Sequence, residues 1–403
     1  MALDTSSFPA YVRSLELTSP VNTRPGRLIP GPPADVVEVG LWLGLGSMML
    51  DTPRLRGLLD GLGLSRDLFR AVGRRLRTRG EWASVLQELA APHITAAERY
   101  VVRGEREPAL QRIKAALTIL YIAINGDGYY FYTPMAERWQ VLPRTQRLYR
   151  MLRHMVGART ERLPFKSSFG RASGLLQLPP EARAARPHSL PALVAFHPLG
   201  SDKDSYDTFL GHFRQAGYAT FCIDLPGHGE NYDGPRLRPD AEAVGVAALD
   251  VLAKHPAIDP ERLGVMGGSI GGFFAQRTAA ASARVKACLA YGSPFDLSYR
   301  MADTLPRVID CFSWVVGAQS LDEAAEAVKH FHLRDTLEKI ECPVCLVHGT
   351  QDHLCDFTAT YEIASRLKAP LTVKPLVGAD HEVVCPATAE LAAPGIEWLN
   401  ETL

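Results

Sequence analysis

The pattern of apolar residues changes once along the chain, near residue 160. From about Leu55 to Val156, apolar residues recur at spacings of three and four, the period of an amphipathic helix. After about Leu163, short apolar runs alternate with helix-like stretches, a pattern typical of β-α-β units. The sequence therefore predicts a helical N-terminal domain, 1–162, followed by an α/β domain, 163–403.

Glycine and proline separate the helical segments of the first domain. The segments are LRGLLDGLG, SRDLFRAVGRRLRTR, EWASVLQELAA, ITAAERYVV and PALQRIKAALTILYIAI, and the separating residues are Gly61, Gly80, Pro92, Pro108 and Gly126. No fixed-period repeat appears, so a helical solenoid is not expected. An aromatic cluster follows the last segment, and its Tyr129, Tyr130 and Tyr132 are either core residues or contacts for an aromatic substrate.

The second domain shows the pattern of a mostly parallel, doubly wound sheet. Its apolar runs each end in Gly, Pro or polar residues, and they are PALVAFHPLG, YATFCIDLPG, RLGVMGGS, KACLAYGSP, PVCLVHGT and LTVKPLVG. Helix-like stretches such as SYDTFLGHFRQAG lie between them, and 294–336 is a candidate helical insertion near the site. Ligands bind beyond the carboxyl ends of such strands, so the chemistry is expected just after each run.

Composition narrows the class of protein. Lys+Arg and Asp+Glu number 44 each, so the formal net charge is zero and neither nucleic acid nor an anionic membrane is an expected partner. The N-terminus shows no basic and apolar secretory pattern, and we expect a cytoplasmic protein. Cys342 and Cys345 form a C-x-x-C, but residues three apart on a strand point to opposite faces, so a redox or zinc site is not expected.

The stretch GVMGGSIGGFFAQ places Ser269 among four glycines, between a predicted strand and a predicted helix. Gly267-Gly268-Ser269-Ile270-Gly271 fits the G-x-S-x-G nucleophile elbow. A sharp turn there would project the serine hydroxyl above the sheet, and Gly267, Gly271 and Gly272 would be required for steric reasons. The alternative is a phosphate-binding loop, but G-x-G-x-x-G and a following lysine are absent. The pattern indicates a serine nucleophile.

A serine nucleophile needs a base, and the base needs an acid. In the α/β-hydrolase order, the acid and then the histidine follow the serine. Asp352 comes just after the run LVHG, and His381 comes just after LTVKPLVG. We therefore expect His381 to accept the Ser269 proton and Asp352 to orient the imidazole. Asp356 is the alternative acid, whereas Asp380 adjoins the base in sequence and is disfavoured.

The remaining candidates surround this predicted triad. An oxyanion hole needs two backbone N–H groups, and Ile270 and Leu199 follow the right strands to supply them. His197 and His228 are expected to be turn residues or, at most, to line the pocket, and His197 is the candidate for the pocket wall. Asp296, after the run KACLAYGSP, is either a loop residue or a second acid at the mouth.

The runs HPLGSDKDSY, IDLPGHGEN, HPAIDPERLGVMGGSIGG and KACLAYGSPFDLSY resemble a known family. They are similar to the α/β-hydrolases grouped with FrsA-type esterases, 2,6-dihydroxypseudooxynicotine hydrolase and the polyketide-shortening hydrolases of fungal pigment and bacterial anthraquinone pathways. The resemblance spans about Leu193–His381, and in the first domain it rests on KAALTILYIAI and RTQRLYRMLRHM. Where that family has a glycine pair in its first oxyanion loop, this chain has His197-Pro198.

The resemblance implies an α/β-hydrolase fold with the N-terminal helices covering the active site. It also implies cleavage of a C–C bond beside a ketone, or of an ester or thioester, in an aromatic or polyketide-like substrate. Such a substrate delocalises the departing carbanion itself, so no cofactor and no metal is expected. The substrate is a small molecule, free or carried on a carrier protein, and a homodimer remains open.

Two other functions fit the same residues. A simple carboxylesterase or thioesterase would use the same serine, histidine and aspartate. A non-catalytic binding protein of the FrsA type is the third alternative, because a fold alone does not prove activity. The complete Ser-Asp-His pattern disfavours this last function.

Overall fold

The computed structural model describes residues 37, 39, 41–46, 50, 67–126, 131–181, 187–298 and 304–403. Contacts between Cα atoms divide these residues into two compact units. Described residues up to 158, together with 305–311, form a helical unit, and the remaining described residues form an α/β unit. The predicted segment LRGLLDGLG and the candidates Tyr129 and Tyr130 lie outside the described residues.

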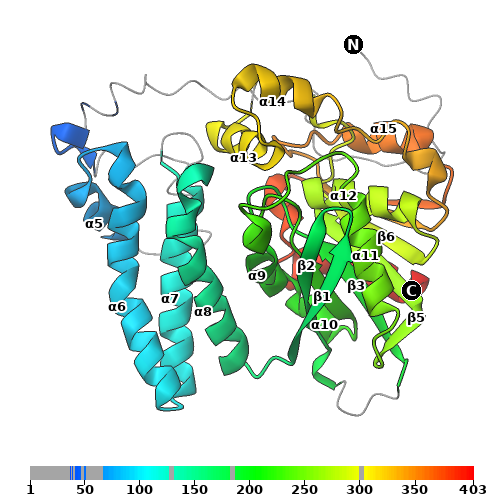
Figure 1. Ribbon diagram of the computed structural model, residues 1–403, viewed down its shortest axis with the longest axis horizontal. Helices are drawn as coiled ribbons and strands as arrows, with labels where there is room; N and C mark the ends of the chain where they lie inside the picture. The colour runs from blue at the N-terminus through cyan, green and yellow to red at the C-terminus, as the bar shows by residue number, and fades with distance from the viewer. Residues whose placement is uncertain are drawn as a thin grey trace. The chain divides into compact units, whose positions relative to one another are not determined.

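The helical unit is built on long helices that lie side by side (Figure 1). Its elements are α5 (Asp67–Arg75), η1 (Arg79–Glu81), α6 (Trp82–Val102), α7 (Arg106–Asn125), η2 (Met135–Gln140) and α8 (Leu142–Met155). Residues of α6 and α7 such as Leu86, Ile113 and Leu120 share one buried core. The indole N–H of Trp82 donates to the Ala123 carbonyl at 3.0 Å and fixes the two helices in register.

Helix α6 runs through Pro92, where the sequence predicted a break. Proline in a helix interior removes one hydrogen bond and costs about 3 kcal/mol. The exposed Pro92 has buried residues of the same core on both sides of it, Ala90 and Ala97. Burial of this common face outweighs the local penalty, so the two predicted segments are one helix.

The α/β unit contains one eight-stranded sheet with the order β1-β2-β4-β3-β5-β6-β7-β8. Strand β2 pairs antiparallel with β1 and β4, and the other pairs are parallel. The strands are β1 (Thr160–Ser167), β2 (Gly170–Gln177), β3 (Leu190–Phe196), β4 (Ala219–Ile223), β5 (Ile258–Gly268), β6 (Val285–Tyr291), β7 (Val344–Gly349) and β8 (Leu371–Leu376). The predicted mostly parallel sheet is confirmed, and its strands β3 and β7 are buried along almost their whole length because both faces are covered.

Helices cover both faces of this sheet (Figure 1). On β3, Leu193 and Ala195 join a core with Tyr206, Phe213 and residues of α16 on one face. Helices α11 and α12 pack against strands of the same sheet, and α11 also contacts α12. The helices of this unit are α9 (Lys203–Tyr206), η4 (Asp207–Leu210), α10 (Gly211–Gln215), η5 (Gly229–Asn231), α11 (Glu242–Leu252), α12 (Ile270–Ala281), α14 (Leu321–Val328), η7 (Leu337–Lys339), α15 (Ala359–Arg366), η8 (His381–Val384) and α16 (Ala389–Thr402), and α13 (Pro306–Val316) is divided between the two units.

Three local features differ from, or refine, the sequence pattern. The stretch SYDTFLGHFRQAG is not one helix but the succession α9, η4 and α10, with Tyr206 and Phe213 still buried. The hairpin β1–β2 was not predicted, because β1 is half-exposed and lacks a continuous apolar run. In the C-x-x-C, Cys345 lies in β7 and Cys342 precedes it; both are unbridged and buried, and burial raises the pKa of Cys342 to about 11 and that of Cys345 to about 12.

Among the described residues, no helix combines the length and the apolar character that crossing a membrane requires.

Candidate active site

Ser269 occupies the turn between β5 and α12. Its backbone has φ 55° and ψ −124°, a conformation that non-glycine residues rarely adopt. Its N–H donates to the Tyr291 carbonyl at 2.8 Å, and its own carbonyl accepts from the Phe273 N–H at 3.1 Å. The strained turn is thus held by β6 on one side and by the first turn of α12 on the other. Strain of this kind, in a residue at a strand's carboxyl end, is typical of functional sites.

Glycines surround Ser269 because neighbouring backbone approaches from several directions. A Cβ at Gly267 would collide with the Gly271 carbonyl, and a Cβ at Gly271 would collide with the Phe196 carbonyl. A Cβ at Gly272 would lie 2.9 Å from that of Ser293. Gly268 is constrained as well, by the carbonyl of Val384 in the loop that follows β8.

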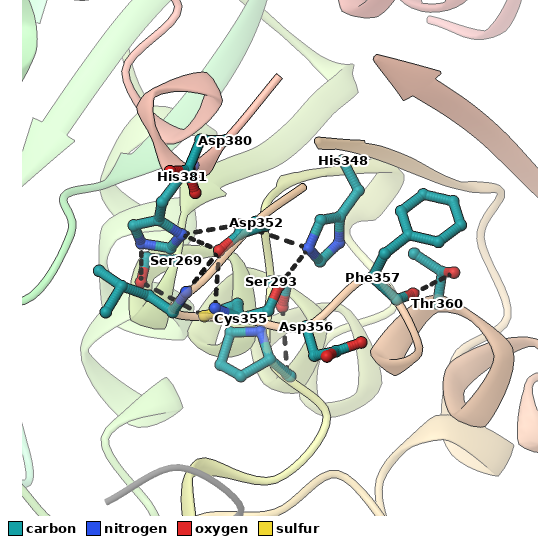
Figure 2. A network of polar contacts seen from close by, with 12 residues as sticks. Ser269, Ser293, His348, Asp352, Cys355, Asp356, Phe357, Thr360, Asp380 and His381 are labelled. Atoms are coloured by element: carbon teal, nitrogen blue, oxygen red, sulfur yellow. Dashed lines mark hydrogen bonds and ion pairs between the residues drawn. The ribbon is translucent and has the colours of Figure 1, made fainter. Parts of the chain in front are cut away.

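His381 bridges the serine and a buried carboxylate, as Figure 2 shows. Its Nε2 lies 3.1 Å from Ser269 Oγ. On the other side of the ring, Nδ1 lies 2.8 Å from Asp352 Oδ2 and 2.9 Å from Oδ1. The structure therefore brings together Ser269, His381 and Asp352, which come from the carboxyl ends of β5, β8 and β7.

Asp352 is fully buried and is surrounded by donors. Its Oδ1 accepts the N–H groups of Leu354, at 2.9 Å, and Cys355, at 2.7 Å. A second imidazole, His348, places its Nε2 3.4 Å from Oδ2 and 2.7 Å from the Cys355 carbonyl. Burial alone would raise the pKa of Asp352, but His381 and then His348 outweigh it and hold the pKa well below its usual range. The carboxylate is thus charged at neutral pH.

The two other acidic residues near this network, Asp356 and Asp380, form hydrogen bonds with groups other than the His381 ring in the contacts described. Asp356 Oδ1 accepts from the Thr358 N–H at 2.9 Å. Asp380 accepts from the N–H groups of His381 and His353, at 2.7 and 2.9 Å, and its Oδ1 lies 2.6 Å from the His353 ring. Asp380 therefore joins the loop of the acid to the loop of the histidine, and it does not bond the His381 ring in the contacts described.

The predicted oxyanion donors lie in two segments that adjoin. Ile270 begins α12 directly after Ser269. Leu199 lies in the turn after β3, and a Cβ on Gly271 would meet the carbonyls of Phe196 and His197 at the end of that strand. The beginning of α12 and the end of β3 are therefore in contact.

His197 and His228 are both buried, and backbone groups occupy both ring nitrogens of each. His197 was a candidate for the pocket wall, but its side chain has no exposed surface, so it holds a turn instead. The expectation that His228 is a turn residue agrees with its contacts.

The last two described candidates also have defined surroundings. The Asp296 carboxylate accepts from the Ser298 N–H and hydroxyl, at 2.8 and 2.6 Å, and pairs with Arg334. Tyr132 lies in the helical unit, where burial, then Asp310 and Cys311, raise its pKa to about 12.

Sequence reasoning missed two residues of this network. The apolar run LVHG predicts only that His348 ends a strand, although a histidine followed by Gly349 at that end is a polar signal. Cys355 lies with its Sγ 3.9 Å from Ser269 Oγ, and the sequence offered no sign of that approach. Among the residues for which coordinates are described, no group of His, Cys, Asp and Glu could hold a metal ion.

This sheet order, with a strained serine after β5, an acid after β7 and a histidine after β8, defines the α/β-hydrolases. The chain thus has the α/β-hydrolase fold, and its residues 212–386 match the model of the prolyl oligopeptidase family.

Its relatives carry hydrolase names. It is 33% identical over 172 residues to 2,6-dihydropseudooxynicotine hydrolase of Paenarthrobacter nicotinovorans, covering 42% of this chain and 45% of that protein. It is 34% identical over 174 residues to hydrolase acrC of Aspergillus aculeatus, covering 34% of this chain and 40% of that protein. The alignments span less than half the length of these curated relatives.

Solved structures extend the similarity beyond the α/β unit. The crystal structure of 2,6-dihydroxy-pseudo-oxynicotine hydrolase matches with a TM-score of 0.69 and 25% identity, over 86% of this chain and 95% of that one. Wild-type AbyA5 matches with a TM-score of 0.60 over 81% of this chain and 86% of that one, and at 19% identity it supports the fold alone.

A buried carboxyl beside the β3 turn has an unusual protonation behaviour. Asp202 caps α9 by accepting from the Ser205 N–H at 3.0 Å, and it is 8% exposed. Burial, then the charges of Asp224 and Asp204, raise the pKa of Asp202 to about 7. In the unfolded chain the same group has a pKa of about 4.

We predict that Asp202→Asn removes a pH-dependent loss of stability. Between about pH 4 and pH 7 the folded chain keeps this proton whereas the unfolded chain has lost it, so the free energy of unfolding falls as pH rises. Asparagine preserves the capping oxygen without the charge. Urea unfolding at pH 5 and pH 8 should show a smaller decrease for Asp202→Asn than for wild type, and the exposed control Asp335→Asn should match wild type. An unchanged pH slope in Asp202→Asn would contradict the assignment.

Proposed function

We propose that this chain is a serine hydrolase in which Ser269 is the nucleophile, His381 the general base and acid, and Asp352 the group that orients His381. The proposal rests on the position of the His381 ring. Its Nε2 lies 3.1 Å from Ser269 Oγ, and its Nδ1 lies 2.8 Å from the Asp352 carboxylate. A serine hydroxyl is a weak nucleophile until such a base accepts its proton. The Asp352 contact to Nδ1 keeps Nε2 free to do so.

The proposed first step forms an acyl-enzyme. Ser269 Oγ attacks the substrate carbonyl carbon while His381 Nε2 takes the hydroxyl proton. The carbonyl oxygen becomes an oxyanion, which the N–H groups of Ile270 and Leu199 would stabilise. Collapse of this intermediate expels the leaving group, and His381 returns the proton to it. Water, deprotonated by His381, then hydrolyses the Ser269 ester and releases the acid.

The leaving group is the finer part of the proposal. We propose that it is a carbon atom beside a ketone, in an aromatic or polyketide-like substrate. The C–C bond then breaks with its electron pair delocalised as an enolate or phenolate, and His381 protonates that carbon. Support comes from the similarity to 2,6-dihydropseudooxynicotine hydrolase, together with the sequence resemblance described above. Esters and thioesters would be cleaved by the same residues, and their oxygen or sulfur leaving groups do not need this delocalisation.

We predict that Ser269→Ala abolishes turnover and covalent labelling without unfolding the protein. Intact-mass spectrometry after treatment with a fluorophosphonate should show one adduct on wild type and none on Ser269→Ala. The exposed Ser298, in the loop after β6, provides the matched control, because Ser298→Ala should label as wild type does. An adduct on Ser269→Ala would assign the nucleophile to another residue.

We predict a preference for aryl 1,3-diketones over short esters. The panel is 4-nitrophenyl acetate, a naphthyl ester and a polyhydroxyaryl 1,3-diketone, with kcat/KM measured for each and the diketone products identified by mass. C–C cleavage should give a carboxylic acid and a methyl ketone or phenol, and should be absent in Ser269→Ala. Turnover of the esters alone would make the protein a simple esterase.

The predicted role of the helical unit as a cover for the site remains a prediction. Tyr132 is its described candidate for contact with an aromatic substrate. If Tyr132→Leu leaves the ranking of the three substrates unchanged, this residue does not select among them.

A further inference from the structure

Two loops at the carboxyl ends of β3 and β4 are joined by a reciprocal pair of histidines. His197, at the end of β3, accepts the Leu225 N–H of the β4 loop at its Nε2, at 3.1 Å. His228, in the β4 loop, accepts the Gly200 N–H of the β3 loop at its Nε2, at 3.2 Å. The ring centroids are 4.8 Å apart. Each loop thus supplies the acceptor for a backbone N–H of the other.

The contacts define the same tautomer for both rings. A nitrogen that accepts a backbone N–H carries no proton of its own. His197 Nδ1 lies 2.8 Å from the Pro198 carbonyl, and His228 Nδ1 lies 3.0 Å from the Pro226 carbonyl, so each Nδ1 carries the proton and donates locally. Every ring nitrogen of the pair therefore has a backbone partner, and both rings are neutral.

A buried ion pair reinforces the junction on one side. Lys203, fully buried, donates from its backbone N–H to Asp224 Oδ1 at 2.8 Å and from Nζ to Oδ2 at 2.5 Å. Its Nζ also lies 3.2 Å from Glu230 Oε2. The charged groups nearest His197 are Asp224, whose Oδ1 is 4.0 Å from Nε2, and Lys203. The ion pair between Lys203 and Asp224 fixes the position of Lys203, where the turn ends. The two histidines fix the turn itself.

We propose that His197 and His228 are positioning residues that set the place of the Leu199 N–H for transition-state stabilisation. The inference rests on the proposed function, because Leu199 is the proposed second oxyanion donor. Leu199 lies between His197 and Gly200, and both of these flanking residues are fixed by the reciprocal bonds. The two histidines therefore fix the backbone on both sides of Leu199.

The decisive experiment compares His228→Gln with His228→Asn. Glutamine can place an amide oxygen where Nε2 accepts the Gly200 N–H, whereas asparagine reaches only the Nδ1 position and loses that acceptor. Misplacing an oxyanion donor should lower kcat by about 10- to 100-fold and change KM little. We expect that loss on an ester substrate for His228→Asn and recovery of most of kcat in His228→Gln. His330→Asn, an exposed histidine beyond α14, is the control.

A second measurement separates this inference from the proposed function. Hydrogen exchange of the Gly200 amide, followed by mass spectrometry of fragments covering 197–203, should accelerate in His228→Asn and stay near the wild-type rate in His228→Gln. If wild type shows no Ser269-dependent turnover, the proposed function fails and the catalytic part of this inference fails with it. If wild type is active but the two variants have equal kcat, the positioning role is wrong while the proposed function stands. Equal exchange rates in the two variants would show that His228 does not hold the turn at all.

Discussion

The buried charge of Asp352 is the constraint on which the rest of the site depends. A carboxylate without solvent contact is strongly disfavoured unless donors replace the lost water. Here two backbone N–H groups, His381 and His348 supply them. Two of the partners, Leu354 and Cys355, follow Asp352 within three residues, so the tight turn after β7 is itself part of the compensation. The hydrogen bond between Asp352 and His381 both stabilises the carboxylate and holds the His381 ring toward Ser269.

Meeting this constraint requires loops from three strand ends to approach one another closely. Glycine at 268 lets the loop after β8 contact the end of β5, and Asp380 joins that loop to the turn of the acid through His353. On the far side of Ser269, Gly271 lets α12 begin against the end of β3. The sheet places the strand ends at one edge, and glycine at positions 268 and 271 leaves room for the neighbouring backbone segments to approach.

The sequence was most informative where local pattern and topology agree. The nucleophile elbow and the strand-end positions of Asp352 and His381 predicted which residues lie within hydrogen-bond distance, since parallel strands bring their carboxyl ends to one edge. Pro92 and the β1–β2 hairpin show the opposite case, because the packing of α6 and the pairing of a half-exposed strand arise from distant residues. The approach of Cys355 and the reciprocal bonds of His197 and His228 could not be predicted either, because their partners are backbone groups or side chains fixed by loop conformation.

We propose that Asp352 acts through His381 on Ser269, and a comparison of kcat between Asp352→Asn and Asp356→Asn tests this role. Both substitutions preserve size, and both residues follow β7, but the structure places only Asp352 against His381 Nδ1 among the contacts described. An asparagine there would stabilise the wrong tautomer of the imidazole, and the same change in another triad enzyme costs about 10⁴ in kcat. We expect a loss of that order in kcat for Asp352→Asn and a small effect for Asp356→Asn. A larger loss in Asp356→Asn, or near-normal turnover in Asp352→Asn, would contradict it.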